Sequence, residues 1–262
     1  MNTPTPFRVT SADGTEIAVW RSGDGPVVLL VHGTAGDHFS FRFVEPLLAE
    51  HCSVHVIDRR GRGKSGDGPD YAIEREYEDL AAVLGRIGEP VTLVGHSFGA
   101  DVALGTSLLV PDLLDRLVLY EPGIGAEEAP PGVIARLESL IDTGEREEAL
   151  LLMLREVAGM SSEEVEVFRS SPMWPVRVVA AHTTPRELRA EVATVFEPAV
   201  FADMRVPALA LLGTESPAWA QETTLEIVAG LPDARVQPLE GHGHAAIMTA
   251  PELVTEAILK FM

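Results

Sequence analysis

The amino-acid sequence predicts an α/β fold with a mostly parallel sheet and a helical segment inserted between two of its strands. Short apolar runs alternate with helical patterns along most of the chain, and this alternation is typical of parallel strands joined by right-handed crossovers. The run Val27–Val31 is apolar at every position, as a strand covered on both faces should be. The alternation stops over residues 123–203, where helical patterns occur without a clear core strand.

The N-terminal part begins with two strands joined by a tight turn. Phe7–Ser11 and Glu16–Arg21 are the predicted strands, and Asp13-Gly14 between them favours a hairpin. The elements expected next are the strand Val27–Val31, a helical stretch over Phe39–Glu50, the strand Val54–Asp58 and the helix Ile73–Ile87. Apolar residues in that helix recur at helical spacing, so one of its faces is expected to pack on the sheet.

The following strand and helix enclose the most specific motif of the chain. The apolar run Val91–Val94 leads into Gly95-His96-Ser97-Phe98-Gly99, and a helical pattern continues to Val110. A G-x-S-x-G motif between a strand and a helix sets its serine on a sharp turn at the edge of the sheet. A serine hydroxyl needs an adjacent base to act as a nucleophile at neutral pH. Ser97 is therefore the predicted nucleophile.

The second half of the chain contains the insertion and the end of the sheet. Leu117–Tyr120 is the last strand predicted before the insertion. Within the insertion, the short helices expected are Val133–Ile141, Glu145–Val157 and Ser162–Phe168, and the prolines that punctuate the rest are Pro172, Pro175, Pro185 and Pro198. The elements expected after it are the strand Ala208–Gly213, the helix Trp219–Ala229, the strand Ala234–Leu239 and the helix Pro251–Phe261. We expect a core over residues 1–122 and 204–262 and a helical cap over residues 123–203, because insertions this long are often lids.

Two histidines are candidates for the base. His242 and His244 lie in a glycine-flanked loop directly after the last predicted strand, which is where a ligand-facing residue of a parallel sheet belongs. A His-x-His metal pair would need further ligands, and the sequence offers none at suitable spacing. A proton-transferring histidine is the stronger interpretation.

The histidine needs a carboxylate that fixes its tautomer and stabilises its cation. Glu121 directly follows the apolar strand Leu117–Tyr120, where an idle carboxylate would be costly to bury. Glu215 lies in the loop after Ala208–Gly213. We favour Glu121 over Glu215, with an exposed turn acid as the simpler alternative for Glu121.

Acyl transfer also needs hydrogen-bond donors for the developing oxyanion. The backbone N–H of Phe98, the residue after the nucleophile, is the first expected donor. The second is expected from the turn His32-Gly33-Thr34 at the end of Val27–Val31, where Gly33 lets the backbone approach the substrate and Thr34 offers its N–H. A purely structural turn is the alternative for Gly33.

A glycine-rich segment resembles a nucleotide-binding loop without meeting its requirements. Gly61-Arg62-Gly63-Lys64-Ser65-Gly66 matches G-x-G-x-x-G and contains Gly-Lys-Ser. The phosphate-loop spacing puts Asp58 where the first glycine must stand, and no helix opens at once after the motif. We therefore interpret this turn as structural.

Composition excludes several function classes. The net charge of −20 opposes binding to nucleic acid or anionic membranes. No apolar run approaches the length of about 18 residues that a membrane span needs, and the N-terminus lacks the pattern of a signal peptide. Cys52 is the only cysteine, so an internal disulfide is impossible. We expect a cytoplasmic protein that needs no cofactor or metal, and the sequence leaves a homodimer open.

With these residues the chain resembles the α/β-hydrolase fold family over almost its whole length. The matching segments are His32-Gly33-Thr34-Ala35-Gly36, Asp58 to Ser65, Gly95 to Gly99 and His244. The resemblance implies an eight-stranded, mostly parallel sheet flanked by helices, with a helical cap after the sixth strand. It also selects His244 over His242, because His244 precedes Pro251 by the seven residues typical of the family.

The sequence departs from the family at the acid. The family has Gly-x-x-Asp after its seventh strand, whereas this chain has Gly213-Thr214-Glu215-Ser216. A glutamate after the sixth strand, here Glu121, together with the segment Ser171 to Pro175, is similar to the zearalenone lactonase group. That resemblance favours an ester or lactone substrate.

The sequence thus predicts a serine hydrolase of a small, largely apolar ester or lactone, with the triad Ser97, His244 and Glu121. Met173, Trp174 and Val178 are expected to line the substrate pocket, with packing of the cap as the alternative. Two other functions stay open on this fold: a lyase or carbon–carbon hydrolase, and a ligand receptor that keeps a hydrolase pocket.

Overall fold

The computed structural model describes residues 6–124 and 130–262, and one sheet of eight strands organises them. The strand order is β1-β2-β4-β3-β5-β6-β7-β8. β1 and β2 pair antiparallel, as do β2 and β4, and the other neighbours are parallel. The strands are β1 (Phe7–Thr10), β2 (Glu16–Ser22), β3 (Val27–Val31), β4 (Ser53–Ile57), β5 (Val91–His96), β6 (Leu114–Tyr120), β7 (Ala208–Gly213) and β8 (Ala234–Leu239).

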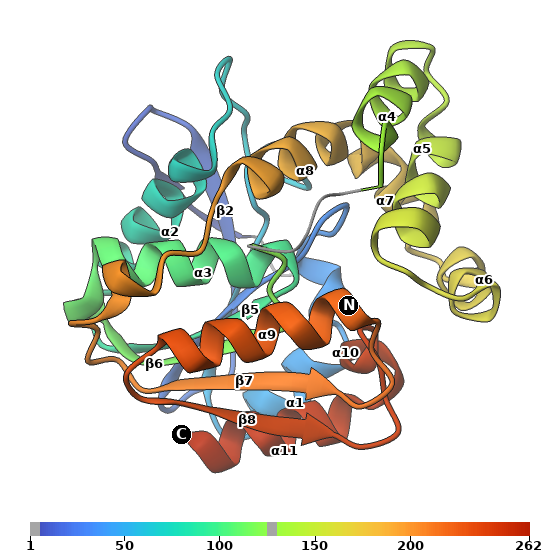
Figure 1. Cartoon of the computed structure of the whole chain (residues 1–262). Coiled ribbons are helices and arrows are strands. Elements are labelled where there is room, and N and C mark those ends of the chain that lie inside the picture. The colour runs from blue at the N-terminus through green and yellow to red at the C-terminus, as the bar shows by residue number, and fades with distance from the viewer. Residues whose placement is uncertain (1–5, 125–129) are drawn as a thin grey trace.

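Helices cover both faces of this sheet (Figure 1). The core helices are α1 (Val44–Ala49), α2 (Ile73–Ile87), α3 (Phe98–Leu109), α9 (Ala218–Gly230), α10 (Ala246–Thr249) and α11 (Pro251–Phe261). Alternate residues of a strand point to opposite faces, so Leu29 and Leu93 pack with residues of α2, α3 and α9. Leu30 and Val94 pack with residues of α1, α10 and α11 on the other face. The fully apolar β3 is buried at every position, as expected for a central strand.

Between β6 and β7 the chain forms further helices, which we call the inserted helices. They are α4 (Val133–Asp142), α5 (Arg146–Leu152), one π-helical turn (Met153–Val157), α6 (Ser162–Ser170), α7 (Trp174–Ala180) and α8 (Thr184–Ala193). Figure 1 shows α4 to α7 grouped together above the sheet, while α8 runs back over α3. They bury one apolar cluster of their own around Leu137, and a second, around Leu150, that also includes Ala35 and Ala245 of the core.

Several boundaries differ from those expected from the sequence. The helical stretch expected over residues 39–50 is a 3-10 turn, His38–Phe41, followed by the separate helix α1. The sequence pattern did not predict α7 and α8, because Pro175 and Pro185 were interpreted as punctuation. Both prolines stand in the first turn of a helix, where a backbone N–H has no intrahelical partner and proline is well tolerated.

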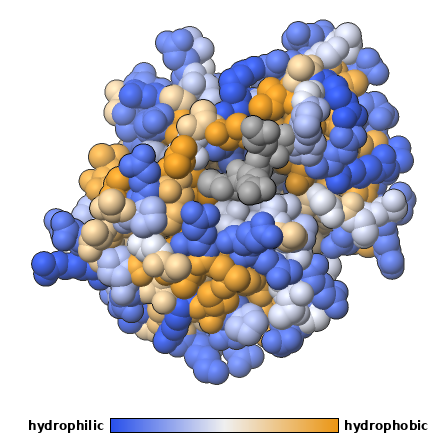
Figure 2. Space-filling view, in the orientation of Figure 1, coloured by the Kyte–Doolittle hydropathy of each residue, from blue (hydrophilic) through white to orange (hydrophobic). Residues whose placement is uncertain are grey.

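The outer surface reflects the composition. Figure 2 shows hydrophilic side chains over much of one face, with apolar residues gathered in patches between them. Exposed apolar side chains at the end of α3 and after α8 include Leu109, Val195 and Val200. Among the described helices, none combines the length and the apolarity needed to cross a membrane.

Candidate active site

Ser97 stands at the junction of β5 and α3 in a strained backbone conformation. Its φ and ψ are 55° and −132°, a region that side-chain-bearing residues rarely adopt and that is often found at functional sites. Its N–H donates a 2.8 Å hydrogen bond to the carbonyl of Tyr120 on the neighbouring strand. A Cβ at Gly95 would lie 2.5 Å from the Cα of Ala100, and one at Gly99 would lie 2.3 Å from the carbonyl oxygen of Val31. The two flanking glycines therefore permit the tight turn that presents Ser97.

His244 and Glu121 form a hydrogen-bonded pair. The Nδ1 atom of His244 lies 2.6 Å from Oε2 of Glu121. Glu121 is fully buried at the end of β6. Its other oxygen, Oε1, accepts hydrogen bonds from the N–H of Gly213 at 2.8 Å and from the hydroxyl of Ser216 at 2.5 Å. An ionised carboxylate is well satisfied by these donors.

The loop after β7 therefore binds Glu121 and does not itself supply a carboxylate to His244. Ser216 occupies the position where the family places aspartate, and its hydroxyl binds Glu121. Glu215 is exposed, and its backbone N–H donates to the carbonyl of His242 at 3.0 Å. Of the two predicted acids, the structure brings only Glu121 into contact with His244.

Two residues that the sequence analysis did not single out form hydrogen bonds with the loop that carries His244. The hydroxyl of Tyr120 donates to the carbonyl of Gly243 and accepts the N–H of Ala246 at 3.1 Å. Nε2 of His96 lies 2.9 Å from the carbonyl oxygen of His244. Burial holds the pKa of His96 well below its usual range, so the ring is neutral and donates to that carbonyl. In the sequence, the position of Tyr120 directly before Glu121 is the signal that could have predicted its place in the site.

The turn after β3 packs against Ser97. A Cβ at Gly33 would lie 2.9 Å from the Cβ of Ser97, so only glycine fits. His32 is fully buried, and its Nε2 accepts the N–H of Arg59 at 3.1 Å. Its Nδ1 lies 2.8 Å from the carbonyl of Gly33. Desolvation and the neighbouring arginines lower the pKa of His32 well below its usual value, so a neutral ring donates to Gly33 and fixes the turn.

Both predicted oxyanion donors lie at this junction. Phe98 begins α3 directly after Ser97, and the first N–H groups of a helix have no intrahelical partner. Thr34 shares a cavity wall with Ser97 and His244. Its backbone N–H makes no hydrogen bond to another residue in the described part of the chain.

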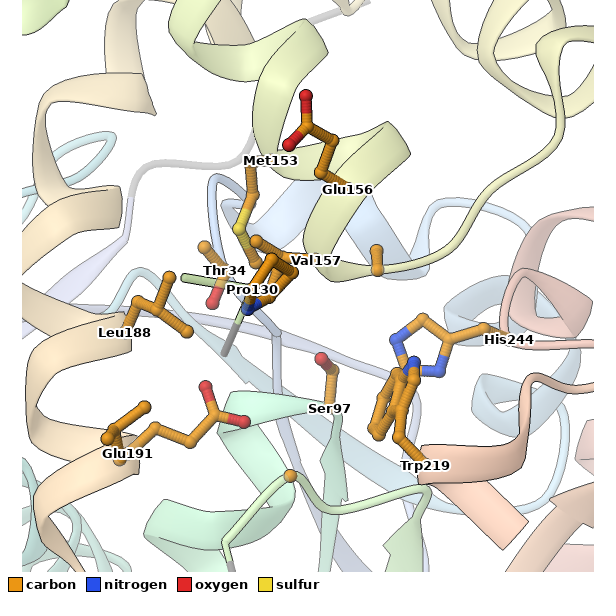
Figure 3. Close-up of a pocket in the computed structure, with 13 residues that line it drawn as sticks. Thr34, Ser97, Pro130, Met153, Glu156, Val157, Leu188, Glu191, Trp219 and His244 are labelled. Carbon is orange, nitrogen blue, oxygen red and sulfur yellow. The ribbon is translucent and has the colours of Figure 1, made fainter. Parts of the chain in front are cut away.

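The cavity above Ser97 has two lobes, which share Thr34, Ser97, Met153, Ala158 and His244. The larger lobe has a volume of about 260 Å³, and its other lining residues include Gly123, Glu156, Val157, Leu188, Glu191 and Trp219 (Figure 3). The smaller lobe has a volume of about 60 Å³, and its other lining residues include Gly33, His96, Met160, Phe168, Arg177 and Met248. Met153 begins the π-helical turn, a feature often found at functional sites.

The pocket residues predicted in the cap need correction. Met173, Trp174 and Val178 line neither lobe. Trp174 is buried among the inserted helices, and its indole N–H donates to Glu147 at 3.1 Å. The cavity walls come instead from the π-helical turn, from α8 and from Trp219 on α9. The orientation of α8 over the core decides this, and no local pattern in the sequence encodes it.

Buried ion pairs join α8 to the core. Arg59 binds Glu76 through two hydrogen bonds of 2.8 and 2.9 Å and also contacts Glu187 of α8. Arg62 contacts Glu187 as well and donates to Thr183 at 2.9 Å. The guanidinium of Arg59 lies 4.6 Å from the ring centre of Phe98. Arg59 therefore contacts both Phe98, the residue after Ser97, and Glu187 of the inserted helices.

The glycine-rich segment has the structural role expected for it. A Cβ at Gly63 would lie 1.8 Å from Oδ2 of Asp58, and the N–H of Lys64 donates to that oxygen at 2.6 Å. The turn thus folds around a buried carboxylate and leaves no room for a phosphate.

One group of side chains in the described residues could contact a metal ion. Ligand atoms of Asp37, His38 and Asp58 lie within 4.8 Å of one another. They already bind protein groups: Nδ1 of His38 lies 2.8 Å from Asp58, and Asp37 accepts the N–H of Phe39 at 3.0 Å. We assign them to the support of the turn after β3.

Comparison with known proteins identifies the family and the fold. The family model of the alpha/beta hydrolase family matches residues 28–257. An alpha/beta hydrolase from Sphaerobacter thermophilus is 35% identical, with a TM-score of 0.87 over 97% of this chain and 99% of that one. An esterase from Exiguobacterium antarcticum (21% identity, TM-score 0.80, 99% of both chains) and an enol-lactonase from Burkholderia xenovorans (18% identity, TM-score 0.83, 97% and 99%) share the fold.

Some curated relatives match this chain over only a small part of their own length. The chain spans only 20% of the length of the probable oxidoreductase EphD of Mycobacterium tuberculosis, to which it is 37% identical over 119 residues. The family model, by contrast, covers most of the chain, including Ser97 and His244. The chain belongs to the alpha/beta hydrolase family.

Proposed function

We propose that this protein is a serine hydrolase that cleaves a small carboxylic ester or lactone through an acyl-enzyme on Ser97. The observation that carries the proposal is the contact between His244 and a buried Glu121, next to a strained serine in the same cavity. The esterase and the enol-lactonase that share the fold support this reaction class.

The roles of the residues follow from their positions. The carboxylate of Glu121 accepts the Nδ1 proton of His244, which leaves Nε2 free to take the proton of Ser97 as the hydroxyl attacks the carbonyl carbon. The N–H groups of Thr34 and Phe98 stabilise the oxyanion that forms. His244 then returns the proton to the leaving alkoxide, and a water molecule releases the acyl group by the same steps.

The cavity favours a small substrate with an apolar body. Its larger lobe has a volume of about 260 Å³, just below the range of about 300–1,000 Å³ typical of ligand pockets. Met153, Val157 and Leu188 line one side of it, and Trp219 lies on the other, beside His244 (Figure 3). The resemblance to the zearalenone lactonase group remains a prediction.

Replacing Ser97 with alanine tests the proposal. We expect wild-type protein to hydrolyse a panel of short-chain ethyl esters and small lactones, and Ser97→Ala to lose that activity by at least about a thousandfold with an unchanged melting temperature. Product analysis on the same panel separates ester hydrolysis from lyase chemistry. Hydrolysis that survives in Ser97→Ala would refute the mechanism.

A further inference from the structure

We propose that the smaller lobe binds a carboxylate of the substrate through Arg177, so that the preferred esters carry an anionic group on the side of Ser97 that faces this lobe. The inference rests on the proposed function and names the substrate class more closely. It starts from a cation in the wall of the cavity that makes no ion pair with a carboxylate of the described residues.

Arg177 comes from α7 and lines the smaller lobe together with Ser97, His96 and His244. Its guanidinium lies 4.9 Å from the ring centre of Phe168, which lines the same lobe. Within residues 6–124 and 130–262, no carboxylate oxygen lies within 4.0 Å of it. The buried Arg59 and Arg62, by contrast, both contact the carboxylate of Glu187.

Arg177 is half-buried, so its side chain has lost part of its contact with water. Desolvation lowers the pKa of Arg177 to about 10, so the side chain is still charged at neutral pH. Taking a cation out of water without a partner is unfavourable, and proteins normally pair such groups. A planar guanidinium with free donors matches a carboxylate, because two parallel hydrogen bonds can form.

The groups around Arg177 leave its charge largely uncompensated. Asp37 is the acid whose charge acts on it, but Asp37 caps the turn after β3 through the N–H of Phe39. Arg42 adds a second positive charge nearby. His32 and His96 also feel the charge of Arg177, and both have pKa values held well below the usual range, so they are neutral.

The larger lobe has no cation comparable to Arg177 among its described lining residues. This difference favours the smaller lobe as the place of the anionic group. The lining of the larger lobe includes Glu156 and Glu191 and no basic residue other than His244 among the described residues. A Cβ at Gly123 would lie 1.6 Å from Oε1 of Glu191 and 3.6 Å from Oδ2 of Asp101. Oδ2 of Asp101 is buried without a hydrogen-bond partner in the described structure. An anionic group placed in this lobe would meet no basic side chain other than His244 among the described residues, whereas in the smaller lobe it meets Arg177.

Matched pairs of esters test the inference. In each pair a terminal methyl group is replaced by a carboxylate: ethyl butyrate with monoethyl succinate, ethyl pentanoate with monoethyl glutarate, and ethyl hexanoate with monoethyl adipate. Release of ethanol gives kcat/KM for each. We expect wild-type protein to have a higher kcat/KM for the anionic member of at least one pair. Arg177→Met should lower that preference about 30-fold, because this factor corresponds to the loss of one charge-assisted hydrogen bond.

Arg42→Met is the matched control, because Arg42 lies near Arg177 but lines neither lobe. It removes the same charge, so it should retain the preference if contact with Arg177 is what selects the anion. A preference for the neutral member of every pair in wild-type protein would overturn the inference while leaving the proposed function intact. An equal loss of preference in Arg42→Met and Arg177→Met would also overturn it, since a long-range field would then explain the selection.

A binding measurement decides the inference even if none of these esters is cleaved. Titration calorimetry on Ser97→Ala with succinate, glutarate and adipate should detect binding of at least one dicarboxylate, and Ser97→Ala/Arg177→Met should bind it at least about 10-fold more weakly. Absence of binding, or equal affinity in the two proteins, would refute a carboxylate site at Arg177. Failure of all esters combined with specific dicarboxylate binding would count against the proposed reaction alone.

Discussion

At the scale of single residues, the carboxylate that contacts His244 directly follows β6 and does not come from the loop after β7. Glu121 has a φ of 47°, in the left-handed region that glutamate seldom adopts, so its backbone is strained in the same way as that of Ser97. The donors from Gly213 and Ser216 hold the carboxylate in place. In this chain the carboxylate that contacts His244 therefore lies at the end of β6, and Ser216 in the loop after β7 donates a hydrogen bond to it.

The two candidate acids can be separated by a matched pair of variants. We expect Glu121→Gln to lower kcat by about a thousandfold, because the amide cannot stabilise the His244 cation and favours the wrong tautomer. Glu215→Gln removes the same charge from an exposed position and should change kcat less than about twofold. Steady-state kinetics on a cleaved ester checks both, and the reverse pattern would transfer the role of the acid to Glu215.

At the scale of elements, α8 connects the inserted helices to the nucleophile turn. Its buried Glu187 is shared by Arg59 and Arg62 of the core, and its Leu188 and Glu191 line the larger lobe. A helix held by charges that no solvent reaches keeps one position over the sheet. The cavity wall therefore depends on an ionic cluster that lies outside the cavity.

Glu187→Gln should destabilise the protein strongly. Loss of the carboxylate leaves two buried cations undercompensated, which typically costs about 3–5 kcal/mol. Glu138→Gln breaks the ion pair of Glu138 and Arg189, whose side chains are 40% and 57% exposed, and should cost less than about 1 kcal/mol. Urea denaturation measures both free energies of unfolding. Similar small losses in the two variants would show that the buried cluster does not anchor α8.

At the scale of the whole molecule, buried carboxyl groups give stability a characteristic dependence on pH. Asp101 is fully buried under Gly123 and Ile124, whose N–H groups both donate to its Oδ1 at 2.9 Å. Burial raises the pKa of Asp101 to about 7, and burial together with Asp101 raises the pKa of Glu191 well above its usual value. The folded protein therefore retains protons that the unfolded chain releases at lower pH.

Asp101→Asn should weaken this dependence. A raised pKa means that its contribution to stability is complete below pH 3.8, the ordinary value, and is lost as the pH rises to about 7. The loss per titrating group is at most about 1.4 kcal/mol per pH unit. Asparagine cannot titrate but can still accept both N–H groups, so the variant should lose less stability than wild-type protein between these pH values. Urea denaturation across this range checks the slopes, and parallel slopes would contradict the assignment.

Local chemistry determined most of the fold and the centre of the site from the sequence alone. The apolar strands, the helix Ile73–Ile87 and the motif around Ser97 are encoded in short segments, because periodicity, glycine geometry and burial act over a few residues. The alpha/beta hydrolase family followed from those motifs. The preference for Glu121 also came from a local argument, the cost of burying a carboxylate directly after an apolar strand.

Only the tertiary structure decided which inserted residues face the cavity. Met173, Trp174 and Val178 were chosen for their apolar character, yet Met153, Leu188 and Arg177 stand beside Ser97. The reason is physical: an apolar side chain on an inserted helix can be buried equally well against a neighbouring helix or in a pocket, and its local sequence is the same in both cases. The choice depends on the orientation of α7 and α8, which is set by long-range contacts such as the buried cluster of Glu187 with Arg59 and Arg62.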